Sequence, residues 1–311
     1  MQGRGHKKSI IMVIDVIVEE GFKKWLVAMG YADSTVTGSV QKVWDFIQWL
    51  SKRGIAEINQ VDGKTVRLYY EYLQKRKSRR NTGSLSVNYI NSNINALKRF
   101  SRYLEESGKG ILEIDLPVKP AETLSKSILS RKEIRLMYQA CNQDTDEYSQ
   151  LLASRDRAIL GIFYGCGLRR SEGLALNVQD VMLKEKLVFV RKGKNYRERY
   201  VPMAETVRED LTQYIRIARK KLLSYSGSKQ EALLISRQAK RLSGNQLIGR
   251  IQYLATLAGI DSKPGVHTLR HSIATHLLQS GMSLEEVSQF LGHASLESTQ
   301  IYTHIANEQK E

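Results

Sequence analysis

The chain has 311 residues, which is enough for two domains with separate hydrophobic cores. It contains only 22 glycines and 4 prolines, so collagen-like, low-complexity and wholly disordered classes are excluded. The 48 lysines and arginines outnumber the 32 acidic residues and give a formal net charge of +16. This charge predicts a polyanionic partner, with nucleic acid as the first choice.

The cysteines and the N-terminal segment bear on the compartment. Cys141 and Cys166 lie far apart in the chain and predict two buried thiols, not a disulfide framework or a metal knuckle. The apolar run over residues 10–18 is interrupted by Asp15 and is too short to span a bilayer. We therefore expect an amphipathic helix there, and a cytoplasmic, nucleoid-associated protein that does not bind membranes.

The first 110 residues carry the apolar periodicity of helices. We expect four of them, over residues 10–29, 33–53, 64–77 and 85–106. These helices predict a small helical bundle over residues 1–110. Residues 111–129 show no sustained period, and we expect a linker there.

From residue 130 onward the pattern mixes helices with short strands. Ser130 with Glu133, and Ser283 with Glu286, form capping-box patterns that each open a helix. Residues 181–203 are typical of a β-hairpin or a small sheet. Further helices are expected over 154–164, 171–176, 204–224, 243–258 and 267–280. The predicted fold is mainly α with a small antiparallel β-sheet: a helical N-terminal domain followed by an α+β domain over 130–311.

The chemistry-bearing residues point away from metals and nucleotide cofactors. Five of the six histidines fall in the last 45 residues, but His267 and His271 lack the glutamate of an H-E-x-x-H zinc motif. Neither a Walker-A loop nor a G-x-G-x-x-G fingerprint occurs, so we expect no metal and no cofactor. Arg, Lys, His and Tyr remain, and these residue types suit phosphodiester cleavage without a metal. Arginine neutralises the phosphate, lysine or histidine transfers protons, and tyrosine holds the phosphate as an ester.

Four motifs place these residue types in a fixed order. They are GCGLRRSE at 165–172, RKGKNYRER at 191–199, HTLRH at 267–271, and LGH at 291–293 followed by TQIYTH at 299–304. Together they resemble the motifs of the tyrosine recombinase family, also called the phage integrase family. In size the chain is similar to Xer-like and transposon-type simple recombinases. The resemblance covers residue 130 to the C-terminus in detail and the first 110 residues only in kind; for residues 1–110 it implies a helical, SAM-like core-binding domain that binds DNA.

The resemblance assigns roles in the first two motifs. Arg169 becomes the first catalytic arginine, and Glu172 its supporting carboxylate. In the second motif Lys194 becomes the general acid. Lys192 stays open as the alternative, because a two-residue shift of the turn keeps the same side-chain face.

The resemblance also assigns roles in the last two motifs. His267 becomes a proton acceptor and phosphate ligand, and Arg270 the second arginine that binds the phosphate. His293 contacts the phosphate, and Tyr302 is the nucleophile.

The family resemblance implies a site-specific recombinase. Such an enzyme cleaves and rejoins DNA through a 3'-phosphotyrosine intermediate, without metal or ATP. It binds two inverted half-sites of double-stranded DNA as a dimer, synapses two sites as a homotetramer and exchanges strands through a Holliday junction. An accessory protein that sets direction is compatible with this scheme. Two alternatives stay open: a type IB topoisomerase-like enzyme that relaxes DNA, and a non-catalytic accessory DNA-binding protein.

Basic runs in both domains predict contacts with DNA phosphates. Asn88, Asn91, Asn93 and Asn95 share one predicted helix, and asparagine pairs well with adenine in the major groove. The residues assigned to DNA binding are Lys75, Arg76, Lys77, Arg79, Arg80, Asn88, Asn91, Lys98, Arg197, Arg199, Arg237, Lys240 and Arg241.

Overall fold

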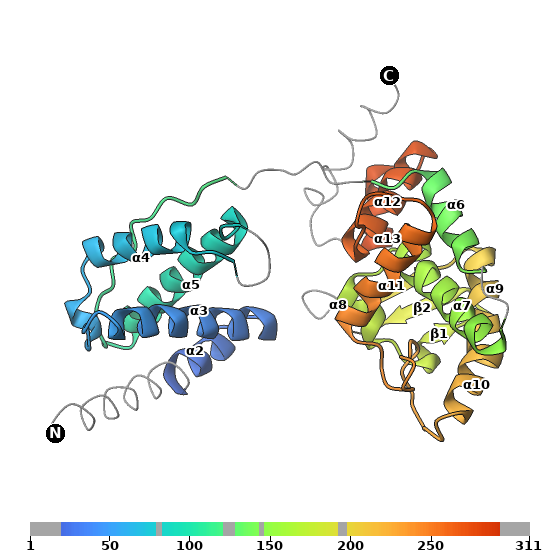
Figure 1. Cartoon of the computed structure of the whole chain (residues 1–311), viewed down its shortest axis with the longest axis horizontal. Helices are drawn as coiled ribbons and strands as arrows, with labels where there is room; N and C mark the ends of the chain where they lie inside the picture. Colours follow the sequence, from blue (N-terminus) through green and yellow to red (C-terminus); the bar gives the residue numbers. More distant parts are fainter. Residues whose placement is uncertain (1–19, 79–82, 121–127, 143–145, 192–197, 293–311) are drawn as a thin grey trace. The chain divides into compact units, whose positions relative to one another are not determined.

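The computed structural model describes residues 20–78, 83–120, 128–142, 146–191 and 198–292. The chain divides into two compact units, 1–124 and 125–311. The first unit is helical, and the second combines helices with a three-stranded antiparallel sheet (Figure 1). The predicted fold class is therefore confirmed. No helix in these ranges has the length and apolar composition needed to cross a bilayer.

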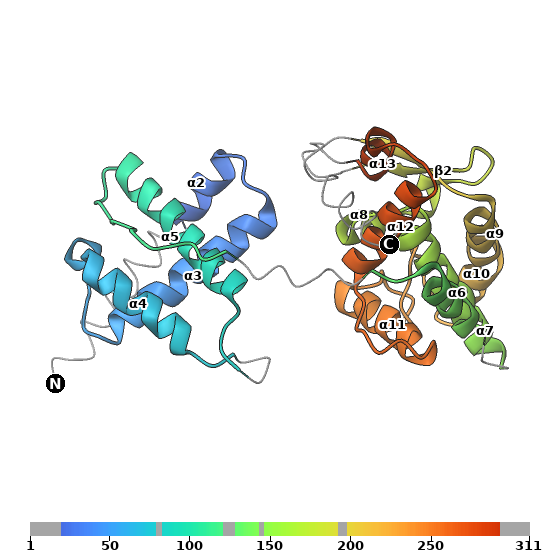
Figure 2. The same cartoon turned by 90° about the horizontal axis from the view of Figure 1, so that it is seen from above.

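The described part of the N-terminal unit contains four α-helices, α2 (Lys23–Ala28), α3 (Asp33–Ser51), α4 (Gly63–Lys75) and α5 (Val87–Glu106) (Figures 1 and 2). Asp62 caps α4, because its Oδ1 accepts a hydrogen bond from the Thr65 N–H at 2.8 Å. Ser86 caps α5 in the same way. The helices bury a shared core of large side chains, which includes Phe22, Leu26, Phe46, Trp49, Tyr69, Leu97, Phe100 and Leu104.

The segment that follows α5 packs against the N-terminal unit. Leu112 and Leu116 are buried in its core, and the Ser101 hydroxyl donates to the Leu112 carbonyl at 2.5 Å. Asn91 donates from its side-chain amide to the Lys119 carbonyl at 2.7 Å. Leu129, by contrast, is buried in the core of the C-terminal unit. The first part of the stretch expected to be a linker thus contributes to the N-terminal core.

The sheet of the C-terminal unit has the strand order β1-β2-β3, with both pairs antiparallel. Its strands are β1 (Val181–Met182), β2 (Leu187–Val190) and β3 (Arg199–Pro202). Val188 pairs with Val181 on one side and with Val201 on the other. The α-helices in the described part of this unit are α6 (Arg131–Ala140), α7 (Glu147–Leu160), α8 (Arg170–Ala175), α9 (Glu205–Gln213), α10 (Arg219–Ser224), α11 (Gly244–Leu257), α12 (Val266–Gln279) and α13 (Leu284–Leu291).

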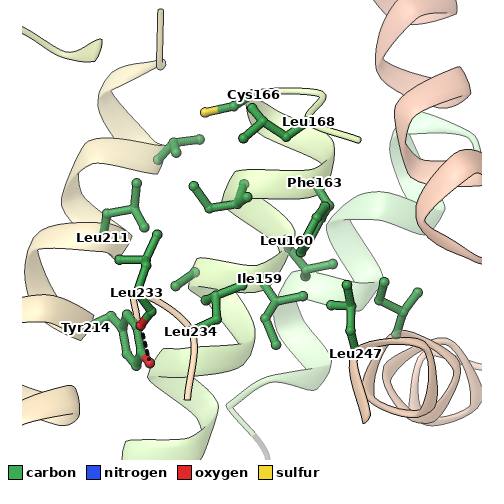
Figure 3. Close-up of a cluster of buried hydrophobic side chains, with 14 of the residues drawn as sticks. Ile159, Leu160, Phe163, Cys166, Leu168, Leu211, Tyr214, Leu233, Leu234 and Leu247 are labelled. Atoms are coloured by element: carbon green, nitrogen blue, oxygen red, sulfur yellow. Dashed lines mark hydrogen bonds between the residues drawn. The ribbon is translucent and has the colours of Figure 1, made fainter. Parts of the chain in front are cut away.

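The core of the C-terminal unit surrounds α7 and the π-helical turn Gly161–Gly165 that continues it. Ile159, Leu160 and Phe163 meet side chains from several other elements (Figure 3). A buried polar contact is satisfied within this core, because the Tyr214 hydroxyl donates to the Leu233 carbonyl at 3.0 Å (Figure 3). The core therefore anchors the turn that precedes the GLRRSE segment.

Both predicted capping boxes are present. The Ser130 N–H donates to Glu133 Oε2 at 2.7 Å, and the Glu133 N–H donates back to Ser130 Oγ at 3.2 Å. Ser283 and Glu286 make the same reciprocal pair at the start of α13. These boxes satisfy backbone donors that the first helical turn leaves open.

Some boundaries differ from expectation. Helix α7 begins at Glu147, seven residues before the predicted start at 154, because the Asp146 carboxylate caps it by accepting from the Ser149 N–H at 2.9 Å. A buried segment over 232–235 was not predicted as a structural element. Two bridges hold this region, Asn177 with Ala232 and Ile235 with Arg241.

Candidate functional site

A tight turn brings the first motif to its position. Gly167 has a φ of +59°, a conformation that glycine adopts without strain. A Cβ atom at Gly167 would lie 2.8 Å from Leu291 Cδ2, so α13 approaches this turn closely. The turn places Arg169 immediately before α8, which begins at Arg170.

The Glu172 carboxylate accepts hydrogen bonds from two arginines. Arg169 donates from its backbone N–H to Oε2 at 2.9 Å and from Nη1 to Oε1 at 2.8 Å. Arg199, at the start of β3, donates from Nη1 to Oε1 at 3.1 Å and from Nη2 to Oε2 at 2.9 Å. Glu172 is 3% exposed, so a buried anion here binds two partly buried cations.

The charge of Glu172 follows from these contacts. Burial alone would raise the pKa of Glu172, because a low-dielectric environment disfavours the charged form. The hydrogen bonds from Arg199 and Arg169 outweigh burial and hold the pKa at about 2. Glu172 is therefore ionised at neutral pH, and its single negative charge leaves the two-arginine cluster with a net positive charge.

Arg270 reaches the same place from α12. It is 4% exposed, and its Nη1 donates to the Gly167 carbonyl at 2.5 Å while its Nη2 donates to the Leu291 carbonyl at 2.7 Å. Arg169 Nη2 donates to the next carbonyl, Gly292 O, at 2.9 Å. The last carbonyls of a helix lack intrahelical partners and carry partial negative charge. Arginines from two separate motifs therefore meet at the C-terminal end of α13.

His267 lies in the first turn of α12 and is exposed. Residues three apart on a helix share a face, so His267 and Arg270 face the same side. The rings of His267 and His271 lie 6.4 Å apart between centroids. Within the described ranges, no three His, Cys, Asp or Glu side chains are grouped in a way that would hold a metal ion.

Several predicted site residues lie outside the described residues. Among the catalytic candidates they are Lys194 with its alternative Lys192, His293 and Tyr302, and among the DNA-contact candidates they are Arg79, Arg80 and Arg197. Residues that the structure describes lie next to two of these segments in the sequence. Arg191 and Arg199 flank the segment with the two lysines, and Gly292 directly precedes His293. The structure therefore brings together Arg169, Glu172 and Arg270 of the predicted catalytic set.

Most of the described DNA-contact candidates are on the surface. Arg76 is partly buried and lies 4.0 Å from the Asp45 carboxylate. The exposed candidates are Lys75, Lys77, Asn88 and Lys98 in the N-terminal unit, and Arg237, Lys240 and Arg241 in the C-terminal unit. Exposed basic side chains are what phosphate contact requires.

Other candidates have contacts inside the protein. Asn93 is 1% exposed and donates to the Tyr89 carbonyl at 2.8 Å, so the hypothesis that it reaches a base edge is wrong. Arg241 donates to the Leu174 and Leu176 carbonyls at 2.8 and 3.0 Å. Arg199 is bound to Glu172, a contact that the sequence interpretation missed. Strand alternation gave a signal for it, because Arg199 shares a face with the buried Val201.

Three buried titratable groups are held in their neutral forms. Burial, together with the charge of Arg131, lowers the pKa of His276 to about 4. The Nδ1 atom of this histidine lies 3.0 Å from the Tyr164 hydroxyl, and His276 is a packed core residue. Burial raises the pKa of both Cys141 and Cys166 to about 12, so both remain thiols at neutral pH. The expectation of two buried thiols is confirmed.

Comparison with known proteins agrees with the motifs. Residues 127–309, more than half of the chain, match the phage integrase family. The chain is 30% identical over 302 residues to tyrosine recombinase XerC 2 of Ralstonia nicotianae, with 96% of this chain and 84% of the relative covered. It is 33% identical over 286 residues to tyrosine recombinase XerD of Pseudomonas aeruginosa, with 91% and 90% covered.

Solved structures share the fold at lower sequence identity. The XerH site-specific recombinase bound to difH substrate, in a pre-cleavage complex, has a TM-score of 0.68 at 21% identity, with 88% of this chain and 78% of that chain covered. The Tn1549 transposon integrase in complex with transposon right end DNA has a TM-score of 0.64 at 16% identity, with 94% and 98% covered. The motifs, the family match and the relatives lead to one conclusion: the chain belongs to the phage integrase family and is a tyrosine recombinase, an enzyme that cleaves and rejoins DNA at specific sites.

Proposed function

We propose that this recombinase cleaves DNA through a 3'-phosphotyrosine formed on Tyr302, without metal or ATP, and exchanges strands through a Holliday junction. The observation that carries the proposal is the meeting of Arg169 and Arg270 at the end of α13. The chain continues from this point to His293 and then to Tyr302. Two cations from separate parts of the chain, the turn before α8 and helix α12, thus lie at the two residues that precede His293.

Arg169 and Arg270 are the groups that bind the scissile phosphate. A guanidinium has five N–H donors in a planar fork, so it can hold a backbone carbonyl and still donate to a phosphate oxygen. The described contacts of the Arg169 side chain use Nη1 and Nη2 once each. Because the arginines are fixed by buried partners, little reorganisation is needed when charge develops on the phosphate.

The chemical step proceeds as an exchange of esters. The Tyr302 oxygen attacks phosphorus while the bond between phosphorus and the 5' oxygen breaks. The phenolic proton passes to His267, and the departing 5' oxygen takes a proton from Lys194. His293 donates to the phosphate. The ester energy is kept in the phosphotyrosine, and attack by the 5' hydroxyl of a partner strand reverses the step.

The assembly follows from the same proposal. Two protomers bind the inverted half-sites of one double-stranded DNA site, and two such sites synapse as a homotetramer. The +16 net charge of the chain supports an extended contact with DNA phosphates. With DNA as its substrate, the enzyme acts on the nucleoid in the cytoplasm. An accessory protein that binds there can set the direction of recombination.

A covalent trap tests the proposal. Wild-type protein and Tyr302→Phe are incubated in EDTA with a library of nicked half-sites, whose short cleaved fragment diffuses away and prevents religation. We expect a slower-migrating protein–DNA band on a denaturing gel for the wild type alone, and its DNA gives the recognition site. Binding of the library without a band, even on a site selected by that binding, would overturn the proposal.

A substrate with a different leaving group can show whether Lys194 or Lys192 is the general acid. A DNA with sulfur in place of the bridging 5' oxygen releases a thiolate, which needs no proton because the thiol pKa is only about 8.5. Lys194→Ala should cleave normal DNA slowly and the sulfur substrate at nearly the wild-type rate. Lys192→Ala should show the same ratio as wild type on both substrates. The opposite pattern would assign the proton to Lys192.

Strand exchange needs a separate measurement. With two synapsed sites, we expect a four-way junction to accumulate when the second exchange is blocked. Relaxation of supercoiled DNA without any junction would instead favour topoisomerase-like chemistry.

A further inference from the structure

The buried carboxylate of Glu172 has two cationic partners, and the phosphate chemistry proposed above uses only one of them. Arg169 belongs to the catalytic motif. Arg199 makes the other two hydrogen bonds to Glu172, one to each oxygen, at 3.1 and 2.9 Å. Its side chain is 16% exposed, and that of Glu172 is 1% exposed. Both Nη atoms of Arg199 are therefore directed at the carboxylate of Glu172, whereas Arg169 uses only its Nη1 there.

Arg199 also touches the end of α13. A Cβ atom on Gly292 would lie 2.5 Å from Arg199 Nε and 2.7 Å from its Cδ. The carbonyl of this same Gly292 accepts the hydrogen bond from Arg169 Nη2. Arg199 therefore packs against the residue that precedes His293, while its guanidinium holds the carboxylate that orients Arg169.

Arg199 also belongs to the hairpin formed by β2 and β3, the third part of the site. It is the first residue of β3, pairs with Val190 of β2, and follows the segment that carries Lys194 and Lys192. Arg191, the residue after β2, is more exposed and makes an ion pair with the buried Asp180, to which its Nε donates at 2.7 Å. On each side of this hairpin an arginine thus forms an ion pair with a buried carboxylate. Of the two, only Arg199, at the start of β3, pairs with Glu172, the carboxylate that also binds Arg169.

We propose that Arg199 is a positioning residue of the recombination reaction: acting through Glu172 and Gly292, it fixes Arg169, the end of α13 and the hairpin relative to one another. The inference rests on the proposed function, since the groups it positions are those of the phosphotyrosine reaction. Without Arg199, the carboxylate would keep a single cationic partner, and the face of Gly292 would lose its packing neighbour. Misplacement of reacting groups by about 1 Å costs on the order of 10²-fold in rate.

The test compares Arg199→Met with Arg191→Met, which breaks the matched ion pair on the other leg of the hairpin. Covalent trapping on the selected half-site is measured at saturating protein, and DNA affinity is measured over a range of salt. We expect Arg199→Met to slow trapping by about 10²-fold, with its affinity and salt dependence within about twofold of Arg191→Met. A phosphate contact would instead reduce the salt slope by about one. Arg199→Lys, which offers a cation but no fork, should recover part of the rate.

A pH profile separates positioning from a loss of folding. Burial raises the pKa of Glu172, and the hydrogen bond from Arg199 is the largest of the effects that lower it. The substitution Arg199→Met should therefore raise the pKa of Glu172. The rate should then begin to fall at a higher pH on the acid side than in wild type or Arg191→Met. Carbon-13 NMR of the Glu172 carboxyl reads the same shift without any cleavage.

The outcomes are distinct for the two proposals. No Tyr302-dependent adduct with wild-type protein would contradict the proposed function, while the NMR titration would still decide whether Arg199 governs Glu172. A wild-type adduct with Arg199→Met trapping as fast as Arg191→Met would overturn the role of Arg199 alone. The role of Arg199 would also be overturned if Arg199→Met trapped DNA slowly but its DNA affinity depended less steeply on salt, as loss of a phosphate contact predicts. An unchanged pKa of the Glu172 carboxyl in Arg199→Met would overturn it too.

Discussion

The two units of the molecule use basic residues in opposite ways. In the C-terminal unit Arg169 and Arg270 are held by a buried carboxylate and by backbone carbonyls. In the N-terminal unit Lys75 and Lys98 are exposed on helices α4 and α5. A phosphate that reacts needs donors in a fixed geometry, whereas a phosphate that only positions the protein can be met by long, solvated side chains.

The difference extends to how each set responds to its surroundings. Exposed lysines interact through solvent, so their contribution to DNA binding should fall steeply with salt. Arg169 and Arg270 are more shielded from salt, and Arg169 also depends on the ionised state of Glu172, whose pKa is held at about 2. Changes in the first set should therefore alter affinity, and changes in the second set should alter rate and stability.

The largest effect is expected from Arg270→Lys, which keeps the charge but removes the planar fork. Loss of a preorganised donor to a developing charge costs about 10²- to 10³-fold in rate, and single-turnover trapping measures it. Arg250→Lys is the matched control, because Arg250 pairs with the buried Asp156 elsewhere in the same unit. Equal rate losses in both variants would contradict a specific role of Arg270 at the phosphate, and with it the contrast to the exposed lysines of the N-terminal unit.

A second prediction concerns Glu172→Gln. Removing one partner of a buried ion pair costs about 3–5 kcal/mol, so the free energy of unfolding should fall by that order at neutral pH. The pKa of Glu172 is lowered from its usual 4.5 to about 2, so the carboxylate stabilises the fold fully above about pH 4.5 and loses this effect as pH falls towards 2.

Urea unfolding of both proteins from pH 7 to pH 3 checks the sign. The difference between wild type and Glu172→Gln should stay constant down to about pH 5 and shrink below it. A difference that grows in acid would contradict the assignment of Glu172 as the ionised partner of Arg169 and Arg199.

A third prediction uses two glycines that both adopt a positive φ. Gly292 has a φ of +63° and lies against Arg199, whereas Gly259 has a φ of +70° and nothing within 4 Å of a built Cβ. In Gly259→Ala the free energy of unfolding should fall by only about 1 kcal/mol, the cost of a non-glycine residue in the left-handed conformation. Gly292→Ala should lose an additional ~1–3 kcal/mol by overpacking and should also trap DNA more slowly. Thermal unfolding and trapping measure the pair, and equal behaviour would refute close packing at Gly292.

The smallest effect is expected from Lys98→Ala on α5. This change should leave stability within about 0.5 kcal/mol and weaken binding to all DNA sequences alike, with the salt slope reduced by about one. Lys24→Ala is the control, because Lys24 is exposed on α2 beside Glu20 at 3.9 Å and was not assigned to DNA. Fluorescence anisotropy at several salt concentrations compares the two, and identical slopes would remove Lys98 from the interface.

Local patterns explain how much the sequence could predict. Ser130 with Glu133, and Ser283 with Glu286, located two helix starts because a capping box is a local signal. The burial of Asn93 was predictable in principle, since it lies on the same helical face as the buried Ile90 and Leu97. Residue type alone, by contrast, predicts a DNA contact for its amide.

Non-local contacts were beyond sequence reasoning. Arg199 and Glu172 are 27 residues apart, and Arg169 and Gly292 are 123 apart, so no local period connects them. The motifs indicated which residue types take part in the reaction. The fold supplied the way in which the end of α13 and the Glu172 carboxylate hold those residues together.

The most direct test of the central claim is to identify the residue that becomes linked to DNA. Wild-type protein trapped on its half-site in EDTA would be digested with protease and nuclease, and the nucleotide-bearing peptide sequenced by mass spectrometry. The account predicts a single modified peptide, with the phosphate on Tyr302. An adduct on any other residue, or one that forms only when a divalent metal is supplied, would contradict it.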